Sequence, residues 1–125
     1  MSLLNIFDKN QNAKNRSHIK NLIEVSISDG KLDNRELDYI IMIAGNYGIT
    51  KEEVISMGAN HKEIEFTPPS SYNAKVRLME DSVKVLLADK MIEEDEVKFC
   101  KGLARKLKLN EFVVDDLINS ILNKT

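Results

Sequence analysis

The sequence is poor in the residues that build most catalytic and metal sites. Its 125 residues include a single cysteine and two histidines, His18 and His61. One cysteine excludes an intrachain disulfide and any zinc or iron–sulfur site built from several thiolates. The two histidines lack the His-Glu-x-x-His spacing of zinc proteases, and no glycine-rich phosphate loop is present. These absences predict a protein that is not an enzyme, with carboxylate-based hydrolysis as the least favoured class.

The chain also lacks a charge excess and long apolar runs. Eighteen Lys and Arg residues against twenty Asp and Glu give a formal net charge of −2. A nucleic-acid-binding protein would need a basic excess, so we expect no nucleic-acid partner. No stretch reaches the ~18–20 apolar residues of a membrane helix, and residues 1–7 (MSLLNIF) do not resemble a signal peptide. The sequence therefore predicts a cytoplasmic protein that is not an integral membrane protein.

Proline is confined to one place, Pro68-Pro69, and long proline-free stretches flank it on both sides. Within those stretches apolar residues recur at helical spacing, and no segment alternates with a period of two. Helices are expected from His18 to Ser28, from Asp33 to about Gly48, and from Thr50 onward. Three further helices carry the apolar sets Val76–Leu87, Val97–Leu107 and Val113–Ile121. The predicted fold is all-α, a single domain of about six to seven helices.

The two halves of the chain match each other at a constant offset of about 60 residues. The matched pairs, which need no gap, include Asp29 with Asp89, Leu32 with Ile92, Asp33 with Glu93, Glu36 with Glu96, Leu37 with Val97, and Ala44 with Ala104. We place the repeats at about residues 17–58 and 77–122, with a linker at about 59–71 and an amino-terminal extension at 1–13. Two helical hairpins related by a pseudo-twofold axis are the expected architecture.

The repeat places acidic residues at the helix–turn–helix junction of each half. If the two hairpins pack about a pseudo-twofold axis, these residues converge: Asp29, Asp33, Glu36, Asp89, Glu93 and Glu96. Clustered carboxylates repel one another, and hard cations such as Ca²⁺ or Mg²⁺ prefer carboxylate oxygens. The pattern is therefore a candidate site for a divalent cation.

An EF-hand is excluded as the form of this site. The first junction matches that loop at its later positions, but Val25 and Ile27 occupy positions one and three, where oxygen ligands are required. In the second half Val85 and Leu87 occupy those positions, and Lys90 replaces the glycine of the turn. These apolar residues belong to the core-facing side of the preceding helix.

The doubled motif ISDGKLDNRE and LADKMIEEDE, each followed by an apolar helix, resembles the tellurite-resistance TerB-like family. The segment YGITKEE before the next short helix is similar too, and the resemblance covers about residues 17–122. It implies an all-helical domain, associated with stress resistance, in which acidic residues are proposed to bind metal. The matching positions are Asp29, Glu36, Asp89 and Glu96, with Asp33 and Glu93 as supporting groups. The second half departs from the pattern at Lys90, whose ammonium group could neutralise Asp89.

A second interpretation makes the acidic residues helix caps only, because carboxylates are favoured in the first turn of a helix. The domain would then be an interaction module for an unidentified protein partner. That partner would contact the basic stripe of Lys98, Lys101, Arg105 and Lys108, or the apolar segment of Leu3, Leu4, Ile6 and Phe7. The default expectation is that this apolar segment packs on its own domain. Cys100 lies on an apolar stripe and is expected in the core.

Overall fold

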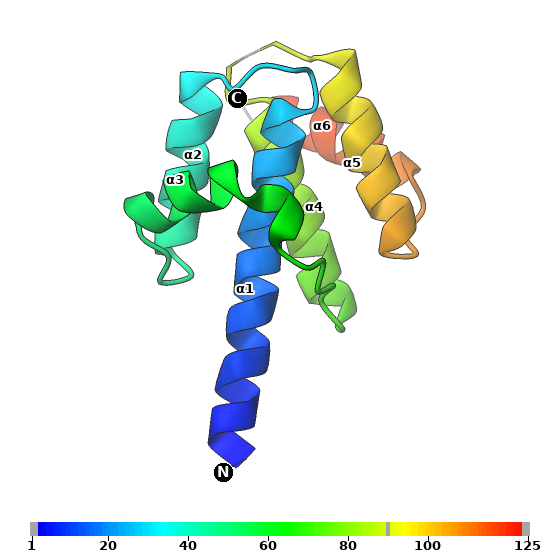
Figure 1. Ribbon diagram of the computed structural model, residues 1–125. Coiled ribbons are helices and arrows are strands. Elements are labelled where there is room, and N and C mark those ends of the chain that lie inside the picture. Colours follow the sequence, from blue (N-terminus) through cyan, green and yellow to red (C-terminus); the bar gives the residue numbers. More distant parts are fainter. Residues whose placement is uncertain (1–2, 90, 124–125) are drawn as a thin grey trace.

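The computed structural model describes residues 3–89 and 91–123, and this part of the chain is helical, with no strand (Figure 1). Six α helices and one short 3₁₀ turn, His61–Glu63, make up the regular structure. The α helices are α1 (Leu3–Ile27), α2 (Asn34–Gly45), α3 (Lys51–Ala59), α4 (Tyr72–Leu86), α5 (Glu94–Lys106) and α6 (Phe112–Leu122). The predicted all-α class and number of helices are confirmed.

Helices α1 and α4 pack against each other and form the centre of the fold. Helices α2 and α3 lie on one side of this pair, and α5 and α6 lie on the other (Figure 1). The buried side chains of the core come from all six helices or their ends, and include Ile19, Leu22, Ile40, Met57, Leu78, Met79, Leu107 and Val114. Burial of one such side chain stabilises the folded state by about 1.5–3 kcal/mol.

Specific residues set the helix ends that flank the acidic junctions. Gly30 follows α1 with a φ of +85°, a left-handed conformation that a residue without a Cβ adopts at little cost. The Asp33 carboxylate then caps α2 by accepting hydrogen bonds from the backbone N–H groups of Arg35 and Glu36. Thr50 and Glu53 form the expected reciprocal capping box at the start of α3. The chain therefore turns sharply between α1 and α2.

Helix α1 begins much earlier than the expected start at His18. It runs from Leu3, and its first turns extend away from the other helices (Figure 1). The reason is local, because residues 3–27 contain neither proline nor glycine and nothing interrupts helix propagation. The region predicted as an amino-terminal extension is therefore mostly helix. The side chains of the apolar segment Leu3–Phe7 lie outside the described residues, and their packing stays a prediction.

Local structure recurs at the offset of 60 residues. Helix α2 starts at Asn34 and α5 at Glu94, and the N–H groups of Ile49 and Leu109 both donate to the carbonyl of an alanine five residues earlier. Buried residues recur at the same offset: Ile19 with Met79, Ile23 with Val83, Val25 with Val85, Glu36 with Glu96, Ile40 with Cys100, and Val54 with Val114. The exact repeat boundaries, the linker limits and the pseudo-twofold axis stay predictions.

Candidate functional site

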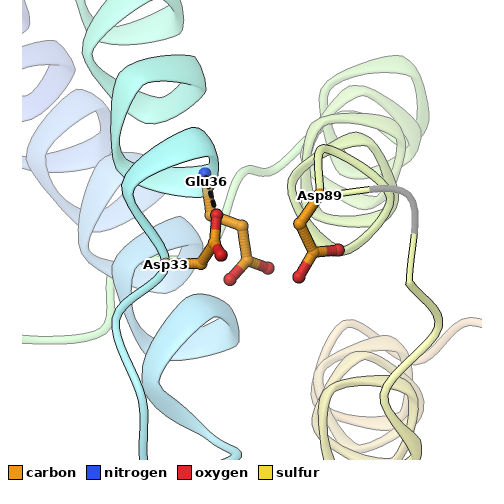
Figure 2. A group of neighbouring side chains, drawn as sticks. All are labelled: Asp33, Glu36 and Asp89. Atoms are coloured by element: carbon orange, nitrogen blue, oxygen red, sulfur yellow. Dashed lines mark hydrogen bonds between the residues drawn. The ribbon is translucent and has the colours of Figure 1, made fainter.

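The two acidic junctions face each other at one end of the helical pair. Asp33 and Glu36 lie at the start of α2, and Asp89 follows the end of α4 (Figure 2). One carboxylate oxygen from each of the three lies within 4.8 Å of the others. Asp33 and Asp89 are partly exposed, whereas Glu36 is 1% exposed. The cluster thus has a buried floor and a rim that faces solvent.

Glu96, at the start of α5, lies in contact with Glu36 and is 0% exposed. Ser26 donates a hydrogen bond of 3.3 Å to Oε1 of Glu36. Oε2 of Glu36 and both oxygens of Glu96 have no hydrogen-bond partner among the described residues, unless the two carboxyl groups bond to each other. Two buried carboxylates in contact are costly, so the pair needs a proton or a cation between its oxygens.

The electrostatics of this pair favour retention of a proton in the absence of a cation. Burial, the contact with Glu36 and the negative charges of Glu36, Asp29 and Asp89 raise the pKa of Glu96 to about 10. Burial also raises the pKa of Glu36, with a further contribution from the charge of Asp89, while its contacts with Glu96 and Ser26 act in the opposite direction. The protonated Glu96 carboxyl group can therefore donate a hydrogen bond to the Glu36 carboxyl group.

Asp29 and Asp89 occupy equivalent turns, one after α1 and one after α4. The carboxylate of each accepts a hydrogen bond from the backbone N–H two residues later. The distance from Lys31 N to Asp29 Oδ1 is 2.9 Å, and that from Met91 N to Asp89 Oδ1 is 3.0 Å. The carboxyl end of a helix carries a partial negative charge, which disfavours a nearby carboxylate. Both helix ends therefore add to the negative potential around Glu36 and Glu96.

Five of the six predicted ligand residues take part in this arrangement. Asp33, Glu36 and Asp89 form the close group, Glu96 contacts Glu36, and the charges of Asp29 and Asp89 act on Glu96. Glu93, the sixth, precedes α5 and forms no side-chain cap or ion pair within residues 3–89 and 91–123. Lys90, which departs from the repeat, lies outside the described residues.

Sequence reasoning missed Ser26, which supplies the one hydroxyl donor to the pair. The available signal was a serine within the apolar stripe of α1, at a position where the second half has Leu86. A buried serine in such a stripe needs a hydrogen-bond partner. In this fold the partner is the carboxylate of Glu36.

The basic stripe predicted as a partner surface is largely paired within the domain. Lys98 lies 3.5 Å from Glu94, Lys101 lies 3.5 Å from Asp115, and Arg105 donates to Glu111 at 2.7 Å. These pairs reduce the positive charge that the stripe offers to a partner.

Cys100 is fully buried, as expected, and burial raises the pKa of its thiol to about 12. Reactivity requires the thiolate, so this cysteine is unsuited to nucleophilic chemistry in the folded protein.

No helix within residues 3–89 and 91–123 is long and apolar enough to cross a lipid bilayer. No family model, curated protein or solved structure matches this chain.

Proposed function

We propose that the chain is a non-enzymatic domain of the TerB-like type that binds one divalent cation between its two helix–turn–helix junctions. The direct ligands in this proposal are Asp33, Glu36 and Asp89, with Glu96 released from its proton to complete the site. Asp29 adds negative potential from the turn after α1. A bound cation would hold the two junctions together and so stabilise this packing of the helices.

The observation that carries the proposal is the buried pair of Glu36 and Glu96. Three of their four oxygens have no donor among the described residues other than the carboxyl group opposite. Buried polar atoms in native proteins are nearly always satisfied. A cation would satisfy several of these oxygens at once and also offset the repulsion from the neighbouring aspartates.

The spacing of the ligand oxygens suits calcium. Calcium–oxygen distances are roughly 2.3–2.6 Å, so two oxygens on opposite sides of one ion lie about 5 Å apart. Oxygens of Asp33, Glu36 and Asp89, which lie within 4.8 Å of one another, can therefore share one calcium ion. Magnesium usually keeps several waters and uses only one or two carboxylates, so it would be held mainly by the solvent-facing aspartates.

The capping interpretation accounts for only part of the cluster. Asp33 caps α2 through two backbone N–H groups. Glu36 and Glu96 are buried against each other, and a helix cap does not require that contact. If the acidic residues were helix caps only, the buried contact between Glu36 and Glu96 would therefore have no explanation.

Calorimetric titration of metal-stripped protein with Ca²⁺, Mg²⁺, Mn²⁺ and Zn²⁺ tests the proposal. We expect heat at one equivalent of Ca²⁺ and a rise in Tm at millimolar concentration. The double variant Glu36→Gln, Asp89→Asn should lose both signals. The matched control Glu65→Gln, Asp116→Asn removes the same two charges from exposed positions and should retain them.

The absence of heat and of a thermal shift with all four cations would refute the proposal. Equal loss in both double variants would also refute it, because the effect would then reflect net charge alone.

A further inference from the structure

A second polar cavity lies at the opposite end of α4 from the acidic junctions. Its volume is about 210 Å³, and its walls come from the middle of α1, the segment around Pro69 and the first turns of α4. Its lining includes Lys14, His18, Tyr47 and Arg77, and among the described side chains no aspartate or glutamate. This is unusual in a chain with more acidic than basic residues.

The two cations of this cavity lack a direct ion-pair partner among the described residues. Lys14 and Arg77 form no ion pair there, although they line the same space. The nearby carboxylate of Asp81 is instead paired with Nε2 of His18 at 2.8 Å. Lys14 is half-buried and Arg77 is exposed, and an anion bound between them would be attracted to both.

The walls of the cavity are held in place by contacts of their own. The ring centroids of His18 and Tyr47 lie 4.9 Å apart, and the Arg77 guanidinium lies close enough to the Tyr47 hydroxyl to lower the pKa of that group against the rise that burial causes. The hydroxyl of Ser17 accepts a 2.8 Å hydrogen bond from the backbone of Thr67, which fixes the proline-containing segment against α1. The charged and polar groups therefore surround a space with defined walls.

We propose that this cavity binds a phosphate dianion, either free or as the monoester of a small molecule. Lys14 and Arg77 supply the charge, and the hydroxyls of Tyr47, Ser70 and Ser71 supply further hydrogen-bond donors. Helix α4 begins at the same place, and its amino end carries a partial positive charge that adds to theirs.

The number of donors distinguishes phosphate from a carboxylate. A carboxylate offers two oxygens, whereas a phosphate monoester offers three terminal oxygens and close to two negative charges at pH 7. The volume of about 210 Å³ corresponds to roughly seven water molecules, which leaves space beside a phosphate for a small organic group. The site is independent of the acidic junctions, because it shares no residue with them.

An NMR titration of amide shifts tests this proposal, with metal-stripped protein at pH 7.5 and constant ionic strength. The probes are inorganic phosphate and glycerol phosphate, with acetate as the carboxylate comparison. We expect saturable shifts near Thr67, Ser70 and Ala74, with a Kd at or below about 1 mM for at least one phosphate probe. Tighter binding of glycerol phosphate would identify an ester as the ligand, and equal or tighter binding of inorganic phosphate would identify the free anion.

The double variant Lys14→Gln, Arg77→Gln should weaken binding at least tenfold, and Lys14→Gln alone should give a smaller loss. The control Arg16→Gln, Lys75→Gln removes two positive charges from the same two helices outside the cavity lining, and should bind as the unaltered protein does. Equal loss in the control, shifts spread over all basic residues, tighter binding of acetate, or no saturation with either phosphate probe would each overturn the proposal.

Discussion

The two halves of the molecule bring equivalent glutamates, Glu36 and Glu96, into contact but surround them with different hydrogen-bond donors. Glu36 in the first half receives a hydrogen bond from Ser26, whereas the residue equivalent to Ser26 in the second half is Leu86. Both glutamates are buried, yet within residues 3–89 and 91–123 no such donor reaches either oxygen of Glu96. The pKa of Glu96 is accordingly raised to about 10, mainly by burial.

This difference assigns separate roles within the pair. Glu36 is the better supported of the two carboxyl groups and accepts the hydrogen bond, while Glu96 holds the proton until a cation replaces it. A symmetric repeat thus yields an asymmetric site, and the hydroxyl of Ser26 is one contribution to the asymmetry. Each of the following predictions tests a difference between the two halves of this site.

The largest expected effect is the pH dependence of stability in chelator. The folded protein holds the Glu96 proton more tightly than the unfolded chain, whose carboxyl pKa has its ordinary value of 4.5. The resulting stabilisation is complete below pH 4.5 and is lost as the pH rises through about 10. Urea denaturation at pH 5 to 9 should show the free energy of unfolding fall by on the order of several kcal/mol.

The control for this measurement is Glu96→Gln, which removes the group that titrates. Its free energy of unfolding should vary much less with pH, with a residual slope from Glu36. Parallel pH profiles for this variant and the unaltered protein would show that Glu96 is not the proton carrier.

The second prediction concerns the two amide substitutions at pH 8 in chelator. Glu96→Gln should raise the free energy of unfolding by about 1–3 kcal/mol, because the unfolded chain can no longer gain by ionising this residue and the amide can donate to Glu36. Glu36→Gln should raise it less, because the remaining Glu96 has no hydroxyl donor in the described part of the chain. A larger gain from Glu36→Gln would reverse the roles assigned to the pair.

Much of the fold could be predicted from sequence because it depends on local signals. Apolar residues at helical spacing, the turn at Gly30 and the capping box of Thr50 and Glu53 all act within a few residues of their own position. The early start of α1 was missed because its first half has no apolar stripe that marks it as helix. That segment also contains no helix-breaking residue, so it forms one continuous helix with the second half of α1.

The residue types of the site could be predicted from the sequence, but the burial and mutual contact of its glutamates could not. The offset of 60 residues pointed to Glu36 and Glu96, yet their burial against each other depends on how the helices pack. Glu93 has the same residue type and spacing as its neighbours but takes no part in the cluster. Lys14 and Arg77 are 63 positions apart and belong to no motif, so only the packing of α1 on α4 brings them to one cavity.

The third prediction compares the two equivalent turn aspartates. Asp89→Asn should weaken Ca²⁺ binding about tenfold or more, which corresponds to about 1.4 kcal/mol, because Asp89 belongs to the close ligand group. Asp29→Asn should weaken it less, because Asp29 acts only through its charge. Asparagine retains the oxygen that accepts the turn hydrogen bond in each case. Calorimetry that finds equal losses would place both aspartates at the same distance from the ion.

The smallest effect concerns the serine that separates the two halves. Ser26→Ala removes the hydroxyl donor to Glu36 and should lower the free energy of unfolding by about 1 kcal/mol at pH 8 in chelator. The loss should shrink at pH 5, where protonation of Glu36 becomes easier and the carboxyl group depends less on a donor.

The matched control is Ser82→Ala, which removes an equally buried hydroxyl from the second half. Its partner is the carbonyl of Leu78 in the same helix, which can also accept the backbone hydrogen bond of α4. This loss should therefore be smaller and independent of pH. If urea denaturation gives equal, pH-independent losses for the two variants, the hydroxyl of Ser26 does not support the charge of Glu36. The difference between Glu36 and Glu96 would then arise from burial and neighbouring charges alone.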